Sequence, residues 1–178
     1  MPSFPFRCLA GALALGASLA AADAAADDAQ IQRGKYLVAI AGCSDCHTPG
    51  GLTGSPDMQR YLAGSDAGFA IPGDGVYVGQ NLTPDKETGI GAWSAADIVK
   101  ALRTGKRPDG GTLSGVMPVA SFAHLTDEDV EAIAAFLKSL PAVRNKAAGP
   151  FKPTDKVSVF VSAVLPPDAY NALPASRK

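Results

Sequence analysis

The chain has few of the residue types that most often form metal and cofactor sites. Its 178 residues include two histidines, three cysteines, three methionines and one tryptophan, and aromatic residues make up 7%. The formal net charge is −1, so no large field of one sign would attract nucleic acid. Beyond the N-terminus, no apolar run approaches the roughly 20 residues that a membrane-spanning helix requires. What remains, 47% hydrophobic and 19% charged, is the composition of an ordinary globular domain.

The first 26 residues have the pattern of a secretory signal peptide. Arg7 supplies one positive charge, an apolar run of Ala, Leu, Gly and Ser follows, and small residues suited to cleavage end near Ala22 or Ala26. Retention of the run as a membrane anchor is the alternative, but the run is short and ends in alanines. We expect cleavage, export to the bacterial periplasm and a mature chain without a transmembrane span. Cleavage also removes Cys8.

Both remaining cysteines lie in one stretch, Cys43-Ser44-Asp45-Cys46-His47. Two cysteines separated by two residues and followed at once by histidine form the attachment signature of c-type haem. The two thiols add to the porphyrin vinyl groups, and the adjacent imidazole then lies under the iron as its proximal ligand. Cys43, Cys46 and His47 are therefore the candidate residues for one covalently bound haem c.

Three other interpretations of this stretch fit less well. A thioredoxin-like redox pair is expected at a strand-to-helix turn of an alternating βαβ pattern, which the sequence does not show. A structural zinc site needs four ligands, and His124 is the sole imidazole left to add to the three ligands here. A simple disulfide between Cys43 and Cys46 would leave His47 without a role.

A first helix is predicted from Asp27 or Asp28 up to the haem motif, because apolar residues recur along it at helical spacing. Gly34 interrupts this helix at some cost in helix stability, which suggests close approach by another element. From residue 48 to residue 85 the density of glycine and proline predicts one long irregular loop. A loop of this length is usually functional, and we expect it to wrap around the porphyrin.

Two further helices are predicted after this loop. Ser94 and Asp97 are suited to a near capping box, and Gly105 ends the helix that they begin. Thr126 precedes three acidic residues and an apolar stripe at helical spacing, which together predict the last helix. The expected fold is therefore all-α, with helices and Gly/Pro-rich loops around one haem.

The arrangement resembles that of class I cytochromes c, which have a haem motif after an N-terminal helix and a methionine before the last helix. More narrowly, the chain is similar from about residue 33 to residue 143 to one haem module of the multi-haem cytochrome subunits of membrane-bound alcohol and gluconate-type dehydrogenases. This chain has one haem motif where those subunits carry several. The motifs that carry the resemblance are Asn81-Leu82-Thr83-Pro84-Asp85, Thr88-Gly89-Ile90-Gly91, Trp93-Ser94, Leu102-Arg103-Thr104-Gly105, Pro108-Asp109-Gly110, Met117-Pro118 and Leu125-Thr126-Asp127-Glu128-Asp129.

The resemblance also implies the second axial ligand of the iron. Of the methionines that remain after cleavage, Met58 lies 11 residues after His47, and Met117 lies 70 residues after it and ahead of the last helix. The family pattern places the axial methionine at Met117, and the alternative is a core methionine that fills a gap. His124 could offer bis-histidine ligation, but its position at the entry to the last helix is typical of an exposed residue.

A methionine ligand would close the sixth iron position and raise the reduction potential relative to bis-histidine haem. The expected function is therefore single-electron transfer from a dehydrogenase to a cytochrome or oxidase acceptor, not catalysis. The alternative is a peroxidase-like enzyme or gas sensor with an open sixth position. Trp93 is suited to pack as a core aromatic against Ile98, and the alternative is that its indole N–H reaches a haem propionate. From the resemblance and geometry, Trp93 and Arg103 are the polar groups expected nearest the propionates, and Gly34 is expected against Phe136 where the first and last helices cross.

The sequence divides into three parts. Residues 1–26 form the signal peptide, residues 27–143 the mono-haem cytochrome domain, and residues 144–178 a Pro/Ala-rich extension that either packs on the domain or is used for docking. The apolar run at 157–165 is too short to span a bilayer and fits a strand or a turn of helix.

Overall fold

The computed structural model describes residues 27–174, and the predicted signal peptide lies outside them. The chain is helical from residue 27 to residue 40, as the apolar spacing predicts. Within the described residues, no helix has the length and apolar character needed to cross a bilayer. The labelled elements that follow are α2 (Cys43–His47), η1 (Met58–Arg60), β1 (Ala67–Ile71), β2 (Gly75–Val78), α3 (Ala95–Thr104), α4 (Val119–Phe122), α5 (Asp127–Ser139), β3 (Phe160–Ala163) and α6 (Pro167–Asn171).

A small sheet corrects the expectation of an all-α fold. β1 pairs with β2 antiparallel, with Phe69 opposite Tyr77, and with β3 in parallel, which gives the strand order β2-β1-β3. A tight turn at 72–74 joins β1 to β2. In it the Asp74 N–H donates to the Ile71 carbonyl over 3.0 Å, and the Asp74 carboxylate accepts from the Tyr77 hydroxyl over 2.7 Å. The glycine and proline that predicted an irregular loop therefore form a hairpin turn.

The caps of α3 and α5 confirm the predicted helix starts. The Ser94 hydroxyl accepts from the Asp97 N–H at 3.1 Å, and the Asp97 carboxylate accepts from the Ser94 N–H at 2.9 Å, which completes a capping box. Gly105, with a φ of 68°, ends α3 in the left-handed region that favours glycine. The Thr126 hydroxyl accepts from the Asp129 N–H at 3.1 Å and begins α5. Each cap of this kind stabilises the fold by about 1 kcal/mol.

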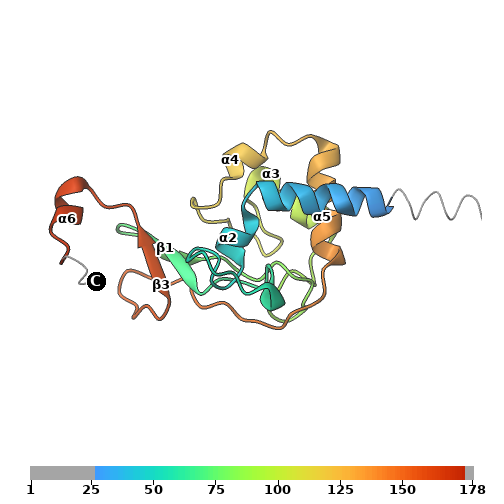
Figure 1. Cartoon of the computed structure of the whole chain (residues 1–178). Helices are drawn as coiled ribbons and strands as arrows, with labels where there is room; N and C mark the ends of the chain where they lie inside the picture. Colours follow the sequence, from blue (N-terminus) through green and yellow to red (C-terminus); the bar gives the residue numbers. More distant parts are fainter. Residues whose placement is uncertain (1–26, 175–178) are drawn as a thin grey trace, which may run out of the picture.

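The N-terminal helix crosses α5 at Gly34 (Figure 1). A Cβ at residue 34 would overlap the carbonyl oxygen of Ala132 and lie 2.7 Å from the Cβ of Phe136. An ion pair beside the crossing joins Arg33 to Asp129 at 2.8 Å. The predicted contact of Gly34 with Phe136 is therefore confirmed, and glycine is present because the two backbones meet there.

The hydrophobic core lies between these helices, α3 and the loops that follow α2. Trp93 packs against it, partly buried, in the same cluster as Ile98. The buried members of the core are Leu37, Val38, Leu62, Ile90, Ile98, Ala132, Ile133, Ala134, Phe136 and Leu137.

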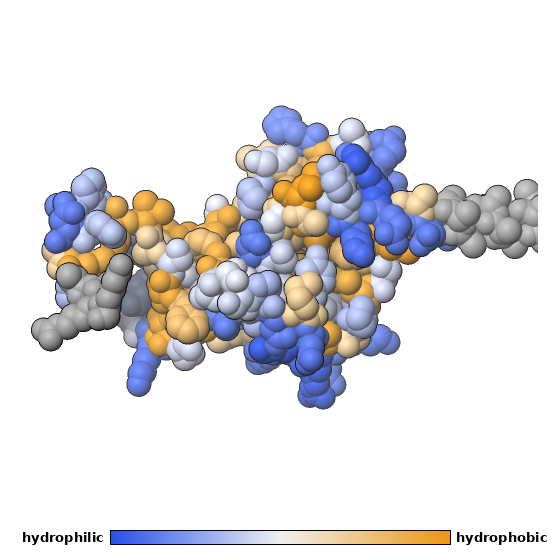
Figure 2. Space-filling view, in the orientation of Figure 1, coloured by the Kyte–Doolittle hydropathy of each residue, from blue (hydrophilic) through white to orange (hydrophobic). Residues whose placement is uncertain are grey.

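The chain after α5 runs back along the loops to reach β1 (Figure 1). There it adds β3 to the sheet, and all four residues of β3 are exposed. Figure 2 shows apolar surface on this part of the molecule. Its large exposed apolar residues are Phe160, Val161, Val164, Leu165, Tyr170 and Leu173.

Candidate haem-binding site

The three predicted haem-attachment residues lie on α2, directly after the N-terminal helix. Gly42 turns the chain between the two helices with a φ of 65°, a conformation that favours glycine. Residues three and four positions apart lie on the same face of a helix, so Cys43, Cys46 and His47 share one face of α2. Both thiols are free and half-buried. This face therefore presents the two thiols and the imidazole that haem c attachment requires.

The imidazole of His47 is oriented by a backbone carbonyl. Its Nδ1 lies 2.7 Å from the carbonyl oxygen of Gln80. A carbonyl can only accept a hydrogen bond, so Nδ1 carries the proton and Nε2 keeps its lone pair. Burial lowers the pKa of His47, against the opposing effect of the bond to Gln80, and so favours the neutral ring. A neutral imidazole with a free Nε2 is the form that ligates iron.

Two glycines let neighbouring backbone pack directly against α2. A Cβ at Gly79 would overlap the carbonyl oxygen of Cys46. A Cβ at Gly51 would lie 2.5 Å from the carbonyl oxygen of Ser44 and 2.6 Å from that of Asp45. Neither position tolerates a side chain, so the haem motif is enclosed by main chain on these sides.

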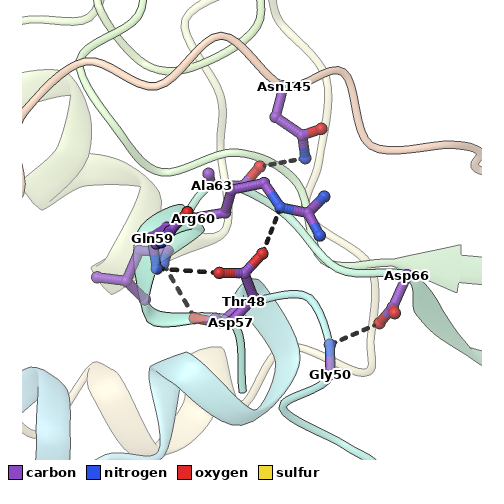
Figure 3. A network of polar contacts seen from close by, with 9 residues as sticks. Thr48, Gly50, Asp57, Gln59, Arg60, Ala63, Asp66 and Asn145 are labelled. Atoms are coloured by element: carbon purple, nitrogen blue, oxygen red, sulfur yellow. Dashed lines mark hydrogen bonds and ion pairs between the residues drawn. The ribbon is translucent and has the colours of Figure 1, made fainter. Parts of the chain in front are cut away.

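A polar network fixes the loop that follows α2 (Figure 3). The fully buried hydroxyl of Thr48 accepts from the Leu62 N–H at 2.9 Å. The Gly50 N–H donates to the Asp66 carboxylate at 2.8 Å. The chain from 48 to 66 therefore leaves the haem motif and returns to it, held by bonds to its own backbone.

The environment of the two thiols distinguishes them from a redox-active pair. Burial raises the pKa of the Cys43 thiol to about 11, and burial also raises the pKa of Cys46. Thiol–disulfide oxidoreductases need the opposite, a lowered thiol pKa. Across residues 27–174, no three His, Cys, Asp or Glu side chains are grouped so that they could hold a metal ion. The residues present therefore fit covalent haem better than redox exchange or structural zinc.

The two candidate methionine ligands differ in burial. Met117 is half-buried in the turn before α4, where its N–H donates to the Ser114 carbonyl at 2.9 Å and its carbonyl accepts from the Val119 N–H at 2.8 Å. Met58, in η1, is 63% exposed. His124 is exposed, as its position before α5 predicts. Axial ligation by Met117 stays a prediction, and its burial favours it over Met58.

Arg103 joins three segments of the fold. Its guanidinium donates to the carbonyls of Ala123 at 3.2 Å and Leu125 at 3.0 Å, and it pairs with the Asp127 carboxylate. These bonds fasten α3 to the turn before α5. The predicted positions of Arg103 and Trp93 near the haem propionates stay predictions.

Sequence analysis missed the residues that orient His47. Gln80 acts through its carbonyl, which any residue could supply, so no side-chain signal marks it. Gly79 was counted only among the glycines that predict a loop. Asn81 appeared only as the first residue of a resemblance motif, and the structure shows it buried directly after Gln80.

A family model described as cytochrome c matches residues 31–141, well over half of the chain. The chain belongs to the cytochrome c family. Membership implies covalently bound haem c, so this cytochrome c is an electron-transfer protein rather than a catalytic enzyme.

Curated relatives of this cytochrome c include subunits of dehydrogenases. The cytochrome c subunit of a quinone alcohol dehydrogenase from Gluconobacter oxydans is 41% identical over 125 residues, which cover 68% of this chain and 24% of that subunit. The gluconate 2-dehydrogenase cytochrome c subunit from Pantoea cypripedii is 42% identical over 127 residues, 70% of this chain and 27% of that subunit.

A third relative carries its haem number in its name. A "Diheme cytochrome c-type" from Cereibacter sphaeroides is 34% identical over 113 residues, which cover 63% of this chain and 36% of that protein. This chain therefore spans about a quarter to about a third of the three relatives. The resemblance to dehydrogenase cytochrome subunits is confirmed.

Proposed function

We propose that this cytochrome c carries one haem and transfers single electrons in the periplasm, from a dehydrogenase to a cytochrome or terminal oxidase. The observation that carries the proposal is the His47 imidazole, oriented by the Gln80 carbonyl 2.7 Å from its Nδ1, on the same helix as two free thiols. The single C-x-x-C-H motif supports one haem. The dehydrogenase subunits among the relatives support a dehydrogenase donor.

Each residue of the site has a separate task in this proposal. Cys43 and Cys46 would tether the porphyrin, and His47 and Met117 would be the ligands of the iron. When bound, the haem supplies a one-electron Fe(III)/Fe(II) couple. A methionine that fills the sixth position excludes oxygen and peroxide, which limits the protein to electron transfer. Trp93 and Arg103 would lie near the propionates.

The proposed division of the chain follows from this function. Residues 1–26 direct export and are removed, and residues 27–143 form the haem domain. Residues 144–178 form an extension that packs against the domain at its start. Weak, transient contact suits a carrier, and with a net charge of −1 the encounter depends on apolar contact more than on long-range attraction.

Optical spectra of the exported protein test the ligand set. The oxidised wild type should show the weak near-infrared sulfur-to-iron band, Met117→Ala should lose it, and the matched control Met58→Ala should keep it. Haem content measured against protein concentration should give one haem per chain. Ready binding of carbon monoxide by the reduced wild type would contradict the proposal and would favour the peroxidase-like or sensor alternative.

Reduction by membranes tests the donor. Membranes of the source bacterium, supplied in turn with an alcohol, gluconate or fructose, should reduce the purified cytochrome with one of these substrates and not without substrate. A fructose dehydrogenase cytochrome subunit is also among the similar proteins, so absence of reduction with all three would refute a donor of the alcohol, gluconate or fructose dehydrogenase kind.

A further inference from the structure

The residue that follows the Gln80 carbonyl is the centre of a buried polar network. Asn81 is 2% exposed. Its side-chain oxygen accepts from the Thr83 N–H at 2.9 Å and from the Thr83 hydroxyl at 2.7 Å. Its side-chain nitrogen donates to the Thr88 hydroxyl at 3.0 Å and to the Val143 carbonyl at 2.8 Å. A buried amide with both ends satisfied is rigid, because leaving either end unpaired costs about 1–3 kcal/mol.

The far side of this network comes from the chain after α5. The Val143 N–H donates to the Thr83 hydroxyl at 3.1 Å, and the Asn145 N–H donates to the Thr88 hydroxyl at 3.1 Å. The side chain of Asn145 reaches the Ala63 carbonyl at 2.8 Å (Figure 3). Residues 143 and 145 lie just beyond residue 141, where the family match ends. The start of the extension is therefore built into the loops around the haem motif.

The same loops hold the carbonyl that orients His47. The Gly79 carbonyl accepts from the Ser65 N–H at 2.8 Å, and the Leu82 N–H donates to the Leu62 carbonyl at 2.8 Å. Between these two bonds lie the Gln80 carbonyl and the Asn81 side chain. The peptide group that joins residues 80 and 81 is planar, so anchoring Asn81, together with the backbone bonds of Gly79 and Leu82 on either side, limits the directions open to the Gln80 carbonyl.

We propose that Asn81 and Thr83 are positioning residues for the axial histidine, and that residues 143–145 complete their anchorage. The network holds the Gln80 carbonyl 2.7 Å from Nδ1 of His47 and so sets the reduction potential of the iron. A firm bond from Nδ1–H makes the imidazole a stronger electron donor, which stabilises Fe(III). Loosening the network should therefore raise the potential. This inference takes one point from the proposed function, that His47 is a ligand of the iron.

Substitution of Thr83 separates positioning from structural support. Thr83→Val keeps the shape and removes the hydroxyl that bonds Asn81 and Val143, whereas Thr83→Ser keeps the hydroxyl. We expect Thr83→Val to shift the Fe(III)/Fe(II) equilibrium about tenfold toward Fe(II), which is about 59 mV for one electron. Thr83→Ser should restore the wild-type potential. Thr154→Val, at an exposed threonine, is the matched control and should leave the potential unchanged.

Two measurements on the holoprotein decide the outcome, the potential by spectroelectrochemistry and the Nδ1 proton resonance of His47 by NMR. The proposal is supported if the potential and the Nδ1 resonance both shift in Thr83→Val and neither shifts in Thr83→Ser. Loss of stability with an unchanged potential and resonance overturns it. If Thr83→Val yields no holoprotein, Thr88→Val replaces it, with the same two outcomes, because it removes the hydroxyl that accepts from the Asn81 side chain and from the Asn145 N–H. A wild-type protein without the sulfur-to-iron band would refute ligation by Met117. The Nδ1 proton resonance of His47 would still test the positioning role of Thr83.

Discussion

The crossing of the N-terminal helix and α5 gives the sharpest stability prediction. Gly34→Ala adds one methyl group where a Cβ would overlap the Ala132 carbonyl oxygen and lie 2.7 Å from the Phe136 Cβ. Alanine should gain up to about 1 kcal/mol in helix propensity. Overpacking of a close-packed contact costs about 1–3 kcal/mol or more, and here the obstacle is backbone, which cannot rotate away. Two helices must therefore separate along the core that contains Leu37, Val38 and Leu137.

We expect a net loss of about 2 kcal/mol in the free energy of unfolding, since separation of the helices loosens several core contacts as well. For a domain of this size that loss lowers the melting temperature by about 4–8 °C. The assay is guanidinium unfolding of the oxidised holoprotein followed by helix circular dichroism. Gln32→Ala, at an exposed position of the same helix, is the control and should change stability by less than about 0.5 kcal/mol.

A double variant provides a second test of why residue 34 is glycine. Because the obstacle to residue 34 is the Ala132 carbonyl, adding Ala132→Gly to Gly34→Ala should not restore stability. A Gly34→Ala protein as stable as the wild type, or one rescued by Ala132→Gly, would refute the backbone contact as the reason for glycine.

Three further predictions concern the Ser94 cap, the stability of the fold at low pH and the haem site. Ser94→Ala removes the capping box of α3 and should lower the free energy of unfolding by about 1 kcal/mol; an unchanged midpoint in guanidinium would contradict the cap. The hydrogen bond from Arg33 lowers the pKa of Asp129, so the pair stabilises the fold above about pH 4 and its contribution is lost as the pH falls through the lowered pKa. Asp129→Asn should therefore flatten the fall in unfolding free energy below that pH, and parallel curves for variant and wild type would count against the linkage. Gly79→Ala places a Cβ on the Cys46 carbonyl and should reduce the yield of holoprotein, with Gly115→Ala compared on the same gels as a glycine substitution that meets no neighbouring atom; equal haem staining would rule out the clash.

Sequence analysis succeeded where a local rule governs the structure. The Ser94 capping box and the Thr126 cap each depend on side chains a few residues apart, and the structure has both caps where they were predicted. Gly34 was predictable for a similar reason, since an interior glycine weakens a helix unless another element needs the space.

The failures involve contacts between distant residues or main-chain groups. The hairpin of β1 and β2 was hidden because its turn residues also read as helix and strand breakers. β3 pairs with a strand that precedes it by 93 residues, Ala67 opposite Phe160, and no local pattern encodes such a pairing. The Gln80 carbonyl leaves no trace in the residue type. Contacts of these kinds form only when distant parts of the chain meet, so no single stretch of the sequence predicts them.

The crossing at Gly34 also has a consequence for the order in which the molecule is assembled. The two partners of the contact, Gly34 and Ala132, are 98 residues apart, so the N-terminal helix has no α5 to pack against until most of the chain has emerged. The haem motif follows that helix directly and emerges early. As the chain emerges there is thus an interval in which Cys43 and Cys46 are on an open chain, and arrival of α5 brings that interval to an end.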